Sequence, residues 1–265
     1  MTAGQAARGP DVNGWYNRAV SVAFSGTDQL SGIDTCTSKS YEGPDSATAS
    51  LAGTCTDDAG NVSAPLGFGL KYDATAPVVS GGQAGRAADM NGWYNRPVSI
   101  AFDGSDQTSG IAGCTNTTYG GPDSGAASVS GSCTDQADNP SGTLGFGLKY
   151  DDTGPAVTGA RAERPPDHGD WFTRPVRFDI TGTDAMSGLL ECPPVTYSGP
   201  DSRDADVTGR CHDRAGNLTS RAFPLSFDAT APPLTDLKAN PGDRTVALSW
   251  NTTPICSPSA PTRRT

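Results

Sequence analysis

The sequence lacks long hydrophobic runs and a helical periodicity of apolar residues, and it has only two histidines. No segment approaches the roughly 18 consecutive apolar residues that span a bilayer as a helix. The first eight residues have no apolar core of the kind found in signal peptides. A Gly-x-Ser-x-Gly elbow, a His-Glu-x-x-His motif and a phosphate loop are also missing. We therefore expect neither a membrane-spanning segment nor a catalytic site in this chain.

Positive charge is scarce as well. The chain has 19 lysines and arginines against 29 aspartates and glutamates, which gives a formal net charge of -10. Because nucleic-acid affinity comes largely from lysine and arginine, we exclude nucleic acid as a partner. The acidity favours solubility and leaves divalent cations as candidate ligands.

Glycine and proline are abundant and have a regular place. The 33 glycines and 21 prolines fall in short clusters between apolar runs that alternate with polar residues. This pattern is typical of short strands joined by tight turns. It predicts an all-β protein.

The sequence also repeats itself every 78 residues. The landmarks are a tryptophan and two cysteines per unit: Trp15, Trp93 and Trp171; Cys36, Cys114 and Cys192; Cys55, Cys133 and Cys211. Such a period indicates a tandem array, in which each unit contributes reach or multivalent contact. We predict units at residues 1–76, 77–154 and 155–231, followed by a different segment at 232–265.

The first unit has no counterpart of the strand entry at 75–79, because Met1 aligns with Val79. We expect a fragment of a longer polypeptide; a misplaced start codon or a frameshift would look the same. The third unit is one residue shorter than the others, and the loss falls after Asn217. Loops tolerate such losses better than strands do.

Within each unit, alternation predicts which side chains face the core. Val20, Val22 and Phe24 alternate with Ser21 and Ala23, so one face of this strand is buried. Two later segments of the unit, at 47–55 and 66–72, show the same period. Short strands with turn signals about every ten residues predict a small β-sandwich for each unit.

The cysteines of each unit are separated by 19 positions, with a Gly-Pro-Asp turn near the middle. We predict one disulfide per unit, because a thin core of this size needs covalent support. The competing reading is zinc, but two cysteines per unit and two histidines in the chain cannot make repeated tetrahedral sites. Disulfides imply an oxidising compartment. Cys256, in the last segment, is left without a function.

The repeated strings resemble the bacterial Ig-like repeats of secreted and cell-surface proteins. They are, in the middle unit, Asn91-Gly-Trp-Tyr-Asn-Arg-Pro-Val-Ser-Ile-Ala-Phe102, Cys133-Thr-Asp-Gln-Ala-Asp-Asn139 and Tyr150-Asp-Asp-Thr-Gly-Pro155. The resemblance covers about residues 1–231. It implies three immunoglobulin-like sandwiches in a row and an extracellular or cell-surface location, and it fixes no single activity.

The last segment resembles a second family. Pro232-Pro-Leu-Thr-Asp-Leu-Lys-Ala-Asn-Pro-Gly-Asp-Arg-Thr-Val-Ala-Leu-Ser-Trp250 is similar to the first two strands of a fibronectin type III domain, with Trp250 at the core tryptophan position. Only that beginning is present. We therefore expect residues 232–265 to be disordered or loosely docked.

Repeated aspartates are the candidate metal ligands. Three sets recur in register, one before a Ser-Gly turn, one after the second cysteine and one at the end of the last strand: Asp28, Asp106 and Asp184; Asp57, Asp135 and Asp213; Asp73, Asp151 and Asp228. Calcium takes six to eight oxygen ligands, and carboxylates at strand ends could supply them. The competing reading is that each carboxylate accepts backbone hydrogen bonds in a turn. If calcium binds, the third set is the better candidate.

Repeated aromatic residues could bind sugars by stacking. The two sets are Tyr16, Tyr94 and Phe172, and Tyr41, Tyr119 and Tyr197. Repeated aromatic positions serve core packing more often than ligand binding, and we favour packing here.

Together these patterns predict a non-catalytic spacer or adhesive stalk in a larger bacterial secreted or surface protein. The chain would be monomeric, need no cofactor other than calcium, and meet a protein or glycan ligand at a cell surface or matrix. Two alternatives are an accessory region of a secreted polysaccharide-degrading enzyme and a calcium-dependent adhesin.

Overall fold

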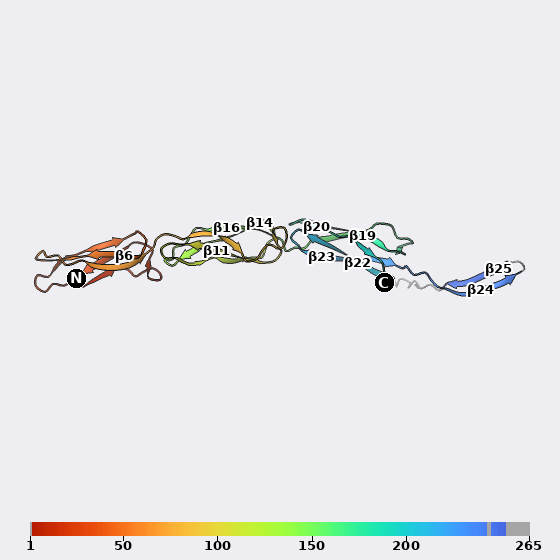
Figure 1. Cartoon of the computed structure of the whole chain (residues 1–265), viewed down its shortest axis with the longest axis horizontal. Helices are drawn as coiled ribbons and strands as arrows, with labels where there is room; N and C mark the ends of the chain where they lie inside the picture. Colours follow the sequence, from red (N-terminus) through yellow and green to blue (C-terminus); the bar gives the residue numbers. More distant parts are fainter. Residues whose placement is uncertain (1, 243–244, 253–265) are drawn as a thin grey trace, which may run out of the picture. The chain divides into compact units, whose positions relative to one another are not determined.

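The computed structural model describes residues 2–242 and 245–252, and every regular element there is a β-strand (Figure 1). The contact pattern divides the chain into two compact units. Unit 1 contains the first two sequence repeats and Arg214–Gly216, and unit 2 contains the rest of the third repeat and the segment after it. Within the described ranges, no helix has the length and hydrophobicity needed to cross a membrane.

The first repeat folds into two three-stranded sheets and a two-stranded ribbon. The sheets have the orders β1-β3-β5 and β2-β8-β6, and β4 pairs with β7 in the ribbon. Strand β2 runs parallel to β8, whereas the other pairs are antiparallel. The strands are β1 (Ala3–Ala6), β2 (Trp15–Tyr16), β3 (Val20–Ser25), β4 (Ile33–Cys36), β5 (Ser38–Tyr41), β6 (Ser46–Gly53), β7 (Cys55–Asp57) and β8 (Leu66–Tyr72).

The second repeat has the same arrangement, with sheets β13-β11-β9 and β10-β16-β14 and the ribbon β12-β15. The strands are β9 (Val78–Ala84), β10 (Trp93–Tyr94), β11 (Val98–Ser105), β12 (Ile111–Cys114), β13 (Asn116–Tyr119), β14 (Ser124–Gly131), β15 (Cys133–Asp135) and β16 (Leu144–Tyr150).

The third repeat merges some of these strands. Its sheets have the orders β17-β19-β21 and β18-β23-β22-β20. The strands are β17 (Ala156–Ala162), β18 (Trp171–Phe172), β19 (Val176–Thr183), β20 (Leu189–Glu191), β21 (Val195–Tyr197), β22 (Ser202–Asp213) and β23 (Leu218–Phe227). The missing residue after Asn217 lies where β22 and β23 meet, and β23 pairs with β22 from Leu218 onward. The shorter connection therefore lets the hairpin continue where the second repeat has a loop.

Alternation along the strands builds the cores as expected. Val20, Val22 and Phe24 of β3 are buried, and the intervening Ser21 and Ala23 are exposed. Each repeat has its own cluster of buried side chains. Since side chains of a strand alternate between its two faces, this register leaves only one face of β3 to pack.

The three predicted cysteine pairs are confirmed as disulfides: Cys36–Cys55, Cys114–Cys133 and Cys192–Cys211. In the first two repeats each pair joins directly opposed residues of the short ribbon. The zinc reading is therefore wrong. Each of these two disulfides therefore links the two strands of a ribbon covalently.

The last segment contains a hairpin formed by β24 (Leu234–Gly242) and β25 (Thr245–Thr252). The pairing matches the two strands expected from the resemblance, whereas the order or disorder of residues 232–265 stays a prediction. Cys256 and the side chains of Val246 and Trp250 lie outside the described residues.

Candidate metal centre

Three aspartates of unit 1 come together where the first repeat meets the second. Asp73 follows β8 of the first repeat, Asp106 follows β11 of the second, and Asp135 ends β15. One carboxylate oxygen from each lies within 4.8 Å of the others. One member of each predicted set is therefore present, drawn from two repeats.

The local chain positions each carboxylate through backbone N–H groups. Oδ1 of Asp106 accepts hydrogen bonds from the amides of Thr108, Ser109 and Gly110 at 2.8–3.1 Å. This turn therefore fixes the position of the Asp106 carboxylate relative to the second repeat.

Asp135 is held in a similar loop. Its Oδ1 accepts from the amides of Ala137 and Asn139, and its Oδ2 accepts from the Asn139 side-chain amide at 2.8 Å. Asp135 is 1% exposed and is buried together with Ala137. The turn interpretation thus accounts for hydrogen bonds of both Asp106 and Asp135.

The Asp73 carboxylate accepts hydrogen bonds from its own linker and from the second repeat. Its Oδ1 accepts from the Thr75 amide of its own linker at 3.2 Å, and its Oδ2 accepts from the Ser109 amide of the second repeat at 2.9 Å. The residue is completely buried. Burial raises the pKa of Asp73, hydrogen bonds from Ser109 and Thr75 oppose that rise, and the neighbouring Asp106 charge adds to it.

The cluster concentrates negative charge away from water. In the part of the chain that the structure describes, no lysine or arginine forms a salt bridge with these three carboxylates. Backbone N–H groups supply partial positive charge, but three close carboxylates still repel one another. Carboxylate oxygens are the hard donors that a calcium ion prefers, and these three would supply part of its six to eight ligands.

The corresponding residues of the first repeat do not gather with Asp73. Asp28 is exposed, and its Oδ1 accepts from Leu30, Ser31 and Gly32. Asp57 binds the amides of its own loop. The three sets are therefore in register along the sequence, but members of one repeat do not make one site.

The candidates of unit 2 occupy the same local turns. Asp184 accepts from the amides of Met186 and Gly188, Asp213 from that of Asn217, and Asp228 from that of Thr230. Asp151, the remaining candidate, is buried at the end of β16 in unit 1. No metal ligation is assigned to these four residues from the geometry of either unit taken by itself.

A comparison with protein-family models finds no match, and neither does a comparison with curated protein sequences. The site must be interpreted from its own geometry.

The repeated aromatic residues lie in the packing of the repeats. Tyr16, Tyr94 and Phe172 are buried. The second set packs edge-on against a core ring, as Tyr41 does on Tyr72 with ring centroids 5.2 Å apart. The Tyr41 hydroxyl donates to the Pro44 carbonyl. These positions offer little open ring surface for stacking on a sugar.

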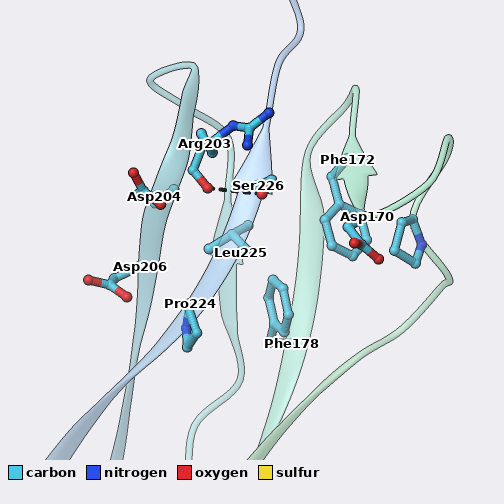
Figure 2. A pocket seen from close by; sticks show the side chains of 11 residues that line it. Asp170, Phe172, Phe178, Arg203, Asp204, Asp206, Pro224, Leu225 and Ser226 are labelled. Atoms are coloured by element: carbon cyan, nitrogen blue, oxygen red, sulfur yellow. Dashed lines mark hydrogen bonds between the residues drawn. The ribbon is translucent and has the colours of Figure 1, made fainter. Parts of the chain in front are cut away.

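A hollow of about 390 Å³ lies on the third repeat, between the segment before β18 and the hairpin β22-β23. Figure 2 shows Phe172 on one side of it and Leu225 on the other, with Asp204 and Asp206 along β22. The Ser226 hydroxyl donates to the Arg203 carbonyl at 2.9 Å. The equivalent face of the second repeat is also hollowed, but small residues such as Gly125 and Ala126 line it. The hollow thus belongs to the repeat architecture, and its polar rim belongs to the third repeat.

Sequence reasoning missed two groups of residues that fix the linker and the junction. Asp45 of the Gly-Pro-Asp turn accepts from the Ala74 amide at 3.0 Å and from the Thr75 hydroxyl. Asn13 and Asn17 reach the second repeat. The recurrence of Asp45 as Asp123 and Asp201 was a signal of its role.

Proposed function

We propose that this chain is a non-catalytic extracellular spacer, made of three immunoglobulin-like units, within a larger bacterial secreted or surface protein. The observation that supports it most is the hydrogen-bonded junction between the first two repeats. A spacer keeps its two ends at a defined separation only if neighbouring units do not rotate freely about their linker.

The linker is held from the side of the first repeat. Asp45 binds Ala74 and Thr75, and Pro77 at its end is buried. Proline fixes φ and favours extended geometry in the residue before it. The second repeat uses the same device, because Asp123 accepts from the Asp152 amide at 3.0 Å.

Four further hydrogen bonds connect the first repeat with the second. Asn17 donates to the Ala137 carbonyl at 2.8 Å and Asn13 to the Gln136 carbonyl at 3.2 Å. In the other direction, the Asn139 side chain donates to the Asp73 carbonyl at 3.0 Å, alongside the Ser109 amide on the Asp73 carboxylate. Contacts on both sides of the linker oppose bending in more than one direction.

The test is a distance distribution between labels at Ser50 and Ser128, two exposed and equivalent positions of repeats 1 and 2. In the full chain we expect a narrow distribution. The double substitution Asn17→Ala and Asn139→Ala should broaden it, because it removes contacts from both sides. Asn61→Ala is the matched control, since Asn61 holds the same loop in the first repeat. A broad distribution in the unsubstituted chain would contradict the spacer function.

A second candidate function, calcium-dependent adhesion, is favoured by the cluster of Asp73, Asp106 and Asp135. Calcium shared by carboxylates of two repeats would stiffen their junction and relieve the repulsion between them. Titration calorimetry of the full chain with calcium, and melting with and without a chelator, test this proposal. Asp106→Asn should remove one binding site, whereas Asp28→Asn, its equivalent in repeat 1, should not. No heat of binding and an unchanged melting temperature would exclude the proposal.

A further inference from the structure

One end of the first repeat is formed by residues 28–32 and 57–61, which we call the free pole. We propose that the free pole is a docking surface for the linker end of another unit of this repeat, tethered ahead of it. The proposal deepens the spacer function and rests on it, in that it takes the junction between repeats 1 and 2 as the functional contact.

The equivalent surface of the second repeat shows what the free pole can bind. Residues 106–110 and 135–139 contact the first repeat through Ser109, Gln136, Ala137 and Asn139. The free pole carries the same residue types at three of these four positions, with Ser31, Ala59 and Asn61, and Asp58 replaces Gln136. Since Gln136 takes part only through its backbone carbonyl, the replacement keeps the contact.

The two surfaces differ in solvent exposure. Ala137 is completely buried and Ser109 is 8% exposed, whereas the equivalent Ala59 is exposed and Ser31 is half-buried. The positions that the junction covers in the second repeat are therefore more open to solvent at the free pole.

The free pole is already folded in the docking conformation. Asp28 accepts from the amides of Leu30, Ser31 and Gly32, as Asp106 does from the amides of its own turn. The loop after β7 is also preformed, because Asp57 and Asn61 repeat the bonds of Asp135 and Asn139. Binding therefore requires little ordering of this surface.

The partner must offer two side-chain amide donors and a strand ending in a carboxylate. Asn13, Asn17 and Asp73 provide these groups in the observed junction. The third repeat has Gly169 and Thr173 at the two asparagine positions, so its linker end lacks both amides. A second copy of this chain cannot use that end as the partner.

The small size of the junction implies that the partner of the free pole is covalently tethered to it. The observed junction depends on a few hydrogen bonds and small side chains, which give weak association between separate molecules. A linker of the Asp-x-Thr-x-Pro type raises the effective concentration of the partner, and the same contacts then suffice. The occupant is therefore a unit joined by such a linker.

The experiment places a copy of residues 1–78 directly ahead of residue 1 of the full chain, which preserves the 78-residue register. Hydrogen exchange of the Ser31 amide is measured, with the Ser109 amide of the same molecule as the internal reference. We expect exchange at Ser31 to slow by about tenfold or more and to approach that at Ser109. The matched variant carries Asn13→Ala and Asn17→Ala in the added copy alone, and it should leave Ser31 exchange as fast as in the original chain.

Two results overturn the proposal and differ in meaning. If Ser109 is protected and Ser31 exchanges at its original rate, the free pole does not dock a further unit, and the spacer function stands. If neither amide is protected, the junction between repeats 1 and 2 is not formed in solution, and the spacer function fails as well.

Discussion

A steric clash explains why each repeat has glycine at one equivalent strand position, in β6, β14 and β22. A Cβ atom added at Gly53 would lie 2.2 Å from the Phe24 ring, and one at Gly131 would lie 2.2 Å from the Phe102 ring. In the third repeat the equivalent Gly209 faces Ile180, whose nearest atoms would be 2.9 Å away. The aromatic ring covers the glycine in the first two repeats, so residue type at one position depends on residue type at the other.

We predict that Gly131→Ala lowers the stability of the second repeat by about 1–3 kcal/mol, the usual cost of overpacking a core. Gly209→Ala should cost less, because the ends of an isoleucine side chain move more easily than an aromatic ring. Gly145→Ala, whose Cβ would meet only the Ser128 hydroxyl at 3.5 Å, is the control. Thermal melting of the three variants checks the order, and equal effects of Gly131→Ala and Gly145→Ala would contradict it.

Asp73 sets a pH dependence of the opposite sign to that of Asp11 and Asp89, whose pKa values are lowered. Because its pKa is raised in the folded state, the charged form is disfavoured by folding. This penalty is fully present above the folded pKa and is relieved as pH falls through it toward the ordinary value of 3.8. Without divalent cations, the melting temperature of unit 1 should therefore rise on mild acidification.

At lower pH, other carboxylates make the stability of the folded state fall again. For Asp11 and Asp89, burial acts to raise the pKa, but hydrogen bonds and charges from arginines and backbone amides outweigh it and lower the pKa. Their stabilisation is present above 3.8 and is lost as pH falls through the depressed folded values. The stability maximum should thus be mildly acidic, and Asp73→Asn should remove the rise. A melting temperature that only falls from neutral pH downward would contradict this.

Each small repeat carries one disulfide of its own. Each bond closes a loop with a sequence separation of 19. We predict that Cys114→Ser with Cys133→Ser destabilises the second repeat by about 3 kcal/mol, from the chain entropy of the open loop. The other two repeats should melt as before, because their bonds and cores are their own. Alkylation without reductant should leave all six bonded cysteines unlabelled, and labelling of any of them would contradict the pairing.

The strands and their buried faces could be predicted because both depend on neighbours along the chain. Alternation at Val20 and Val22 gave the core face of β3, and the spacing of Cys36 and Cys55 gave the disulfide. The continuous hairpin of the third repeat could not be predicted in this way. A deletion after Asn217 marks a loop in the sequence, but only pairing across the sheet shows that the remaining residues join the strands.

The metal candidates show where sequence reasoning ends. Register grouped Asp28 with Asp106, and Asp57 with Asp135, by their equivalent turns. The structure instead brings Asp106 and Asp135 to Asp73 of the preceding repeat. Contact between repeats is a tertiary property that a period of 78 residues does not encode, so the members of the cluster could be named but their grouping could not.

The linker ends of the first and third repeats differ in residue type. The first repeat has two asparagines at its linker end, whereas the third has Gly169 and Thr173. Only the first of these two linker ends carries the side-chain amides that donate to the Gln136 and Ala137 carbonyls in the junction between repeats 1 and 2.

Mechanical unfolding of single molecules tests how many cooperative units the chain contains. Contact density groups the first two repeats into one unit, but each repeat has a separate core cluster and its own disulfide. We therefore predict three unfolding steps of nearly equal length, and two unequal steps would show that repeats 1 and 2 unfold together. Reduction should lengthen each step by about 60 Å, since the chain enclosed by each disulfide is then released at up to ~3.6 Å per residue. Steps that keep their length after reduction would mean that the disulfides are not formed in the unreduced protein, which would contradict the pairing of the six cysteines.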